Sequence, residues 1–204
     1  MVLTPSTMLP LGTPLPSFQL EQVWGAQGAV GQGDRGEEWS TAALEPAPVL
    51  VLFLCAHCPF VKHIESELSR LERDTSGRIQ IVAISSNSTL THPQDGPEGL
   101  REQAERNGWR FPYLFDASQA VARAFHAACT PDLYLFNSAH QLVYRGQLDA
   151  SRPGNDQPLD GRDLRTAIEA LLNGQPIPEP QQPSIGCNIK WHPDSAEPSA
   201  AIDR

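Results

Sequence analysis

The sequence predicts an α/β protein with a central mixed β-sheet flanked by helices, an N-terminal extension and a C-terminal tail. Two apolar runs on either side of an amphipathic stretch indicate a β-α-β unit in the first half of the chain. Two later strand-like runs, separated by five residues, indicate an antiparallel hairpin. A parallel pair and an antiparallel pair within one sheet make that sheet mixed.

The β-α-β unit begins with Val49–Leu54, six apolar residues in a row that suit a strand covered on both faces. After Pro59, apolar residues recur in steps of three and four, while the charged residues, Glu67 among them, fall elsewhere on the helix. The apolar positions are Val61, Ile64, Leu68 and Leu71. Gly77 ends this helix, and Ile79–Ile84 forms a second strand, parallel to the first after a right-handed crossover.

The remaining elements of the predicted core are helix Pro97–Asn107, strand Tyr113–Phe115, helix Asp116–Ala127, the hairpin strands Asp132–Phe136 and Leu142–Gly146, and helix Leu164–Leu172. In the helix over 116–127, we expect Val121, Ala124 and Phe125 to face inward. The last helix is amphipathic and is expected to cover the hairpin.

We expect a single domain in three parts. Residues 1–48 form a lead-in, partly irregular or with one short hairpin, that includes a Gly-rich run over 25–36. Residues 49–174 form the core, and residues 175–204 form a Pro-rich tail with a polar end, which contains Cys187.

Composition excludes several classes of protein. A formal net charge of −9 would repel nucleic acid and anionic lipid. The first twenty residues lack a basic start and are broken by prolines, and no later run approaches the length of a membrane span, so we expect a cytoplasmic protein without a membrane partner. Four cysteines are too few for a secreted disulfide scaffold of this size, which favours catalytic or metal-binding cysteines.

The motif Cys55-Ala56-His57-Cys58 lies where the first core strand meets its helix. A helix N-terminus stabilises a thiolate, the reactive form of cysteine. Two cysteines three residues apart can form a disulfide, so we expect Cys55 to attack a substrate disulfide and Cys58 to resolve the mixed disulfide. His57, between the thiols, is expected to tune their redox balance. The alternative is a chance pair of inert, buried cysteines.

A second signal is Cys129-Thr130-Pro131, directly before the hairpin, where a proline suits the first residue of a strand or a bend. A cis Thr130–Pro131 bond would fit this position. A CxxC motif after a central strand, together with an X-Pro bond before a later hairpin, resembles the thioredoxin superfamily. In that superfamily a cis-proline loop faces the CxxC motif and helps to bind the substrate backbone.

The segments LCAHCPFVKHI, VAISSN, FPYLFD, ACTPDLYLF, VYRGQLDASRPGN and PSIGCNIKW make the resemblance more specific. They are similar to the peroxiredoxin-like redoxins of the alkyl hydroperoxide reductase/thiol-specific antioxidant superfamily, over about Leu11 to Trp191. The resemblance implies a thioredoxin-like fold and thiol-disulfide oxidoreductase activity, with Cys55, Cys58, Thr130 and Pro131 carried over as site residues.

The sequence also departs from these relatives. A peroxiredoxin carries Pro-x-x-x-Thr/Ser-x-x-Cys, whereas alignment on Cys58 puts Cys55 at the hydroxyl position and Val51 at the proline. Pro131 is present and no arginine directly precedes it, which also disfavours peroxidase chemistry. The buried acid that thioredoxins carry in the preceding strand is missing, and Glu45 is the nearest acid on that side.

Two further cysteines are possible auxiliary redox residues. Cys129 stands two residues before Pro131, and Cys187 lies in a tail that could fold back over the domain. One hypothesis is a Cys129–Cys187 pair. The alternative is that Cys129 is a small buried hydrophobe and Cys187 an exposed tail residue.

We therefore expect a thiol-disulfide oxidoreductase that acts in redox homeostasis on protein or small-molecule thiols and disulfides. A thioredoxin or glutathione system is expected to reduce it. Its redox-active disulfide requires no bound cofactor. A thiol peroxidase is the first alternative. A second is a zinc or iron–sulfur protein whose ligands come from Cys55, Cys58, Cys129 and Cys187 or His57.

Overall fold

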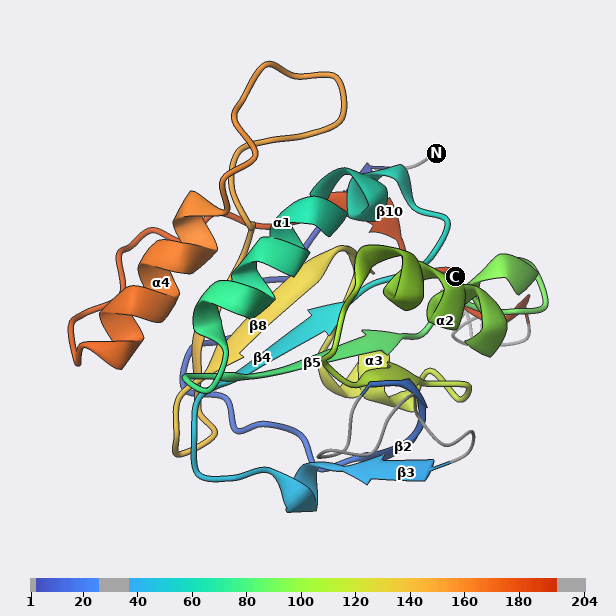
Figure 1. The fold of residues 1–204 in the computed structure, drawn as a ribbon, viewed down its shortest axis with the longest axis horizontal. Helices are drawn as coiled ribbons and strands as arrows, with labels where there is room; N and C mark the ends of the chain where they lie inside the picture. Colours follow the sequence, from blue (N-terminus) through green and yellow to red (C-terminus); the bar gives the residue numbers. More distant parts are fainter. Residues whose placement is uncertain (1–2, 26–36, 194–204) are drawn as a thin grey trace, which may run out of the picture.

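The structure is a computed structural model that describes residues 3–25 and 37–193. The Gly-rich run predicted over 25–36 lies outside these residues from position 26 onward, as does the polar end beyond position 193. Over the described ranges the chain folds into two β-sheets and four α-helices. Figure 1 shows how these elements are arranged.

The larger sheet has the strand order β3-β2-β6-β5-β4-β8-β9 in the described part of the chain. Its strands are β2 (Gln19–Trp24), β3 (Glu37–Ser40), β4 (Val49–Phe53), β5 (Gln80–Ser85), β6 (Tyr113–Phe115), β8 (Asp132–Phe136) and β9 (Leu142–Arg145). β4, β5 and β6 run parallel, whereas β8 is antiparallel to both β4 and β9. This confirms the predicted mixed sheet, its parallel pair and its hairpin.

Helices cover both faces of this sheet. α1 (Pro59–Thr75), α2 (Pro97–Asn107) and α4 (Arg162–Leu172) pack their apolar residues with Leu50 and Leu52 of β4. α3 (Ala120–Ala124) packs with Val49 and Val51, which point to the opposite face. Figure 1 shows α4 beside α1, with α1 and α3 on opposite sides of β4 and β5. β4 is buried on both faces, which accounts for its unbroken apolar sequence.

A smaller antiparallel sheet joins the two ends of the described chain. β10 (Ile185–Asn188) lies between β1 (Leu3–Pro5) and β7 (Cys129–Thr130). Figure 1 shows β10 beside the N-terminal end of α1. Segments expected to be a lead-in and a tail therefore contribute strands that cover the end of α1.

The helix predicted over Asp116–Ala127 is wrong in length, because α3 has five residues and Ala124 is exposed. Gln119 sits in the left-handed region with a φ of 62°, which prevents the helix from starting earlier. Its side-chain amide donates to the carbonyl groups of Ser86, at 2.7 Å, and Lys190, at 2.8 Å. Long-range hydrogen bonds thus hold Gln119 in a conformation that helix periodicity does not reveal.

One charged position also differs from the expectation. The apolar face predicted for α1 is buried, but Glu67 is buried as well, with 1% of its surface exposed. Its carboxylate accepts hydrogen bonds from Arg70 and from Arg165 of α4, each at 2.6 Å. A buried carboxylate requires such partners, and here they tie α1 to α4.

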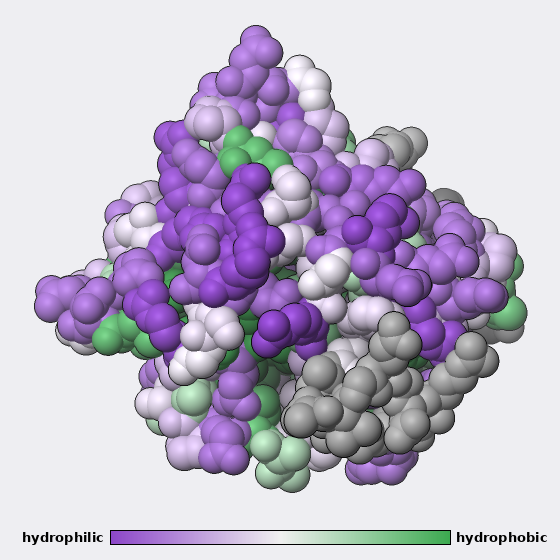
Figure 2. All heavy atoms as spheres, in the orientation of Figure 1, coloured by the Kyte–Doolittle hydropathy of each residue, from purple (hydrophilic) through white to green (hydrophobic). Residues whose placement is uncertain are grey.

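Among the described residues, no helix is long and apolar enough to cross a bilayer. The face seen in Figure 2 is mostly hydrophilic, with small separate apolar patches.

Two short 3-10 helices, η1 (Thr41–Ala43) and η2 (Pro93–Asp95), complete the fold, and η2 lies in the loop after β5. Parallel strands end at the same edge of a sheet, so this loop lies next to the loop after β4.

Candidate functional site

Cys55 and Cys58 lie between the end of β4 and the start of α1. Cys58 is the N-cap residue of α1, with extended backbone angles, and Pro59 follows in the first turn. Proline fits this first turn because it has no N–H group to leave unpaired. Both cysteines are fully buried, with 0% of their surface exposed. Exposure therefore does not distinguish Cys55 from Cys58 as the attacking thiol.

The Thr130–Pro131 peptide is cis, as predicted, and the loop that carries it lies against both thiols. The Thr130 hydroxyl lies 3.3 Å from the sulfur of Cys55, and the carbonyl oxygen of Thr130 lies 3.3 Å from the sulfur of Cys58. One residue thus contacts both cysteines, through its side chain and its backbone.

Asp95 of η2 holds the loop between the cysteines, and sequence reasoning missed it. One of its carboxylate oxygens accepts the backbone N–H groups of Ala56, at 2.9 Å, and His57, at 3.0 Å. The other accepts from the Nδ1 of His57, at 2.5 Å, and from the side-chain amide of Asn87, at 2.8 Å. Asp95 is fully buried. The sequence did place Asp95 in the polar loop after β5. Because β4 and β5 are parallel neighbours, this loop lies beside the loop that carries the cysteines, and this could have indicated Asp95 as a site residue.

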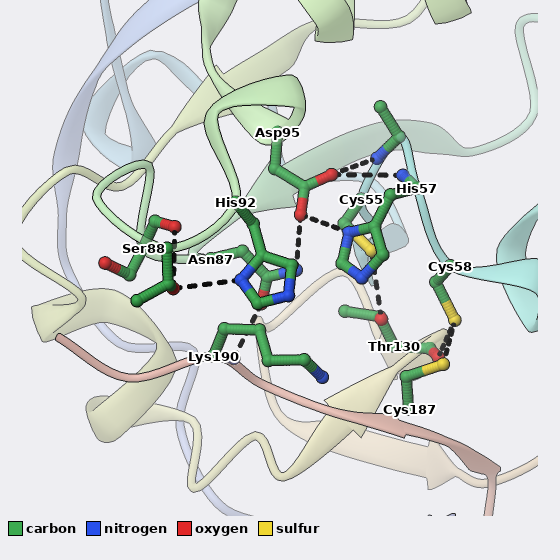
Figure 3. A network of polar contacts seen from close by, with 12 residues as sticks. Cys55, His57, Cys58, Asn87, Ser88, His92, Asp95, Thr130, Cys187 and Lys190 are labelled. Atoms are coloured by element: carbon green, nitrogen blue, oxygen red, sulfur yellow. Dashed lines mark hydrogen bonds and ion pairs between the residues drawn. The ribbon is translucent and has the colours of Figure 1, made fainter. Parts of the chain in front are cut away.

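His57 points toward Asp95 rather than between the two thiols (Figure 3). Its ring also lies against that of His92, with 4.7 Å between ring centroids. A ring nitrogen of His57, the Cys55 sulfur and an Asp95 oxygen lie within 4.8 Å of one another. His57 is therefore close enough to Cys55 to act on it electrostatically, in an orientation that Asp95 fixes.

The two thiols differ in acidity. A hydrogen bond with Cys55 is the main effect that lowers the pKa of Cys58, and contacts with Cys187 and the backbone of Val61 add to it against the opposing effect of burial. The result is a pKa of about 5 for Cys58. Burial, the hydrogen bond with Cys58 and the charge of Asp95 raise the pKa of Cys55. Cys58, at the helix N-terminus, is therefore the more acidic of the two thiols.

Cys187 joins this pair and Cys129 does not. The sulfur of Cys187 lies 2.7 Å from that of Cys58, whereas the sulfur of Cys129 lies 3.5 Å from the carbonyl oxygen of Pro131. Cys187 pairs across the small sheet with Thr130, so Cys129 points to the opposite face. This register does not support the Cys129–Cys187 pair, because neighbouring residues of a strand alternate between faces. Burial raises the pKa of Cys129, which favours an inert thiol.

Cys55, His57 and Asp95 form the one cluster of possible metal donors found in the described residues. Both Asp95 oxygens already accept two hydrogen bonds each, so binding a cation would disrupt the loop. The ligand set suggested by the sequence is also not assembled, because Cys129 faces away. The arrangement fits thiol chemistry better than metal ligation.

A groove of about 600 Å³ opens beside the loop. Ala56 and His57 line it together with charged residues of α1 and α2, namely Lys62, Glu65, Glu98, Glu102 and Arg106. It provides a polar approach to the half-buried part of the motif.

Comparison with known proteins shows the family and the fold of the chain. Residues 11–145 match the model of the AhpC/TSA family. A crystal structure of an uncharacterized conserved protein from Geobacillus kaustophilus is 44% identical, with a TM-score of 0.87 over 96% of this chain and 99% of that one. A hypothetical protein from Sinorhizobium meliloti 1021 is 39% identical, with a TM-score of 0.85 over 93% and 99%. Among curated proteins, none matches this chain.

More distant structures share the fold alone. A secreted Mycobacterium tuberculosis disulfide oxidoreductase is 15% identical, with a TM-score of 0.55 over 76% of this chain and 96% of that one. Mycobacterium bovis AhpC is 16% identical, with a TM-score of 0.58 over 82% and 94%. The predicted thioredoxin-like fold is thereby confirmed.

The low pKa of Cys58 makes a direct prediction. In the reduced protein, the ultraviolet absorbance of thiolate should rise with a midpoint near pH 5, where the pKa of Cys58 lies. The Cys58→Ser variant should lose this transition, and the Cys129→Ala variant should keep it. A first thiolate transition near pH 9 in the wild-type protein would contradict the assignment.

A second prediction concerns the contribution of Asp95 to the stability of the fold. Burial alone would raise the pKa of the Asp95 carboxyl, but hydrogen bonds from His57 and Asn87 outweigh it and lower this pKa. A carboxyl with a lowered pKa stabilises the fold above its unfolded pKa of about 3.9, and this contribution is lost as the pH falls further.

The Asp95→Asn variant should therefore lose about 1–3 kcal/mol of unfolding free energy at pH 7, and the deficit should shrink below about pH 4. Chemical denaturation across this pH range measures the difference. The exposed Asp156→Asn variant is the matched control and should stay within about 0.5 kcal/mol of wild type. A deficit independent of pH would count against the role of the carboxylate charge.

Proposed function

The chain belongs to the AhpC/TSA family, and from this premise we propose that it is a thiol-disulfide oxidoreductase working through the Cys55/Cys58 dithiol. The observation that supports this most strongly is the contact of Thr130 with both sulfurs. The Thr130 backbone beside these sulfurs pairs with β10, and an extended substrate would dock by taking the place of that strand, as main-chain pairing does in other peptide complexes.

We assign the first attack to the thiolate of Cys58. Its sulfur attacks one sulfur of a substrate disulfide and forms a mixed disulfide, and the other substrate sulfur leaves as a thiolate. Cys55 then loses its proton and attacks the Cys58 sulfur of the mixed disulfide, which releases the second substrate thiol. The chain ends as a Cys55–Cys58 disulfide, and two electrons have passed to the substrate.

This order reverses the roles expected from the sequence. Both orders require a conformation that exposes the attacking sulfur, and the alternative order, with Cys55 attacking first, also requires the raised pKa of Cys55 to fall. Asp95 opposes such a change, because its charge lies near Cys55 and one of its oxygens accepts the N–H groups of both Ala56 and His57.

The partners that fit this chemistry are protein or small-molecule disulfides, and a dithiol reductant of the thioredoxin or glutathione type that regenerates the reduced pair. We place the reaction in the cytoplasm, where such systems keep thiols reduced. No bound cofactor is needed, because the cysteines carry the electrons themselves. Analysis of the purified protein for zinc and iron tests the metal-binding alternative, which stoichiometric metal would favour.

Disulfide reduction tests the proposal. With dithiothreitol as the electron source, the wild-type protein should accelerate insulin reduction, and the Cys55→Ser and Cys58→Ser variants should both fall to the uncatalysed rate. The Cys129→Ala variant should retain the wild-type rate, because its sulfur faces away from the pair. Equal rates for wild type and both active-site variants would refute the proposal.

Peroxidase activity is the second candidate, and the acidic Cys58 thiolate at a helix N-terminus favours it. Hydrogen peroxide would oxidise this thiolate to a sulfenic acid, and a neighbouring thiol would then form a disulfide and release water. Rapid peroxide consumption, with dimedone labelling at Cys58 in a Cys55→Ser/Cys187→Ser variant, would place this activity first. Slow consumption without labelling would leave disulfide exchange as the only function proposed.

A further inference from the structure

The strand that carries Cys187 is held against the dithiol along its length. Cys187 lies opposite Thr130, the residue that contacts both active-site sulfurs. Beyond it, the N–H of Ile189 donates to Ala128 at 3.1 Å, and that of Lys190 to the side chain of Asn87 at 2.8 Å. Asn87 also donates to Asp95, so the strand and the CxxC loop share one hydrogen-bonded network (Figure 3).

The other end of the strand is anchored as well. Ser6 and Ser184 exchange two hydrogen bonds of 2.9 Å, and the Ser184 hydroxyl donates to the carbonyl of Gly146 at 2.7 Å. Interactions on both sides thus fix the position of Cys187. It is almost fully buried, with 2% of its surface exposed.

Gly186 allows this close approach. A Cβ atom at this position would lie 2.1 Å from the carbonyl oxygen of Thr130 and 3.2 Å from the ring of Pro131. Any other residue would push the strand away from the loop, since these are backbone atoms and a proline ring. The sequence therefore provides the space that brings the Cys187 sulfur to Cys58.

Cys58 lies between two thiols. Its sulfur is hydrogen-bonded to Cys55 on one side and is 2.7 Å from Cys187 on the other. Burial is the main effect that raises the pKa of Cys187, to about 12, and the hydrogen bond with Cys58 and the charge of Cys58 add to it. The reduced site therefore holds one thiolate flanked by two thiols, and Cys58 is the sulfur that each of them can reach.

We propose that Cys187 is a third redox residue, which replaces Cys55 as the disulfide partner of Cys58. The inference rests on the proposed function, because it begins from the Cys55–Cys58 disulfide. The sulfur of Cys187 attacks that of Cys58, the Cys55–Cys58 bond breaks, and a Cys58–Cys187 bond forms. The proton of Cys187 passes to the departing Cys55 sulfur. No electron is gained or lost, since one disulfide replaces another.

This exchange places β10 in the role of an internal substrate. The strand occupies the edge of β7 beside Thr130, where an extended external segment would have to lie in order to bring its sulfur to Cys58. An external disulfide must therefore compete with β10, and the Cys58–Cys187 bond locks the strand in place.

Disulfide mapping tests the inference. The reduced wild-type protein and its variants are incubated with glutathione disulfide, quenched with acid, alkylated, and mapped by mass spectrometry. In Cys55→Ser we expect the Cys58–Cys187 disulfide as the main product, because the thiol nearest to a glutathionylated Cys58 is then Cys187. In Cys187→Ser we expect only Cys55–Cys58, and Cys129→Ala should give the wild-type pattern.

A second variant tests the position of the strand without removing a thiol. Gly186→Ala should lower the yield of Cys58–Cys187 by about tenfold, because overpacking displaces β10. Circular dichroism establishes that each variant is folded. Persistent glutathione on Cys58 in folded Cys55→Ser, with no bond to Cys187, would overturn the inference. Insulin reduction by the wild-type protein would still support the proposed function in that case, so the two failures are distinguishable.

Discussion

Asp95 accepts four hydrogen bonds at the base of the CxxC loop, and the chemistry of the site depends on this interaction. A thiolate is usually stabilised by free N–H groups near it. Here the carboxylate occupies those of Ala56 and His57. Burial and the hydrogen bond with Cys58 raise the pKa of Cys55, and the charge of Asp95 raises it further. The N-terminus of α1 stabilises the thiolate on Cys58 instead. A residue contributed by η2 thus adds to the difference in acidity between the two cysteines.

Because β10 lies next to Cys58, this C-terminal strand controls what can reach the Cys58 sulfur. Once the thiolate lies on the residue that begins α1, the surface next to that residue determines what can react with it. β10 fills this surface, and the chain can do so only because Gly186 has no side chain. The same sulfur is suited to exchange with a disulfide and to reaction with peroxide, since both need an acidic thiol at a helix N-terminus.

The two similar structures at 44% and 39% identity extend over nearly the whole chain, so the comparison includes β10 as well as the family domain.

Local patterns predicted most of the scaffold. The apolar run of β4, the three- and four-residue spacing on α1 and the proline before the hairpin each depend on neighbours in sequence, and the structure contains all three elements. Elements that depend on distant partners could not be predicted in this way. α3 is short because Gln119 bonds to Lys190, 71 residues away, and Asp95 acts on a loop 38 residues before it. Cys187 meets Cys58 across 129 residues, through a strand register that no spacing reveals.

The measurement that tests the central claim most directly is the reduction potential of the protein in glutathione redox buffers, with the thiols trapped and counted at each ratio. The account predicts a two-electron couple between about −270 and −120 mV, in which an intramolecular disulfide involving Cys58 forms as the buffer becomes more oxidising. A chain that keeps Cys58 reduced throughout this range, or carries only glutathione mixed disulfides on it, would contradict the account.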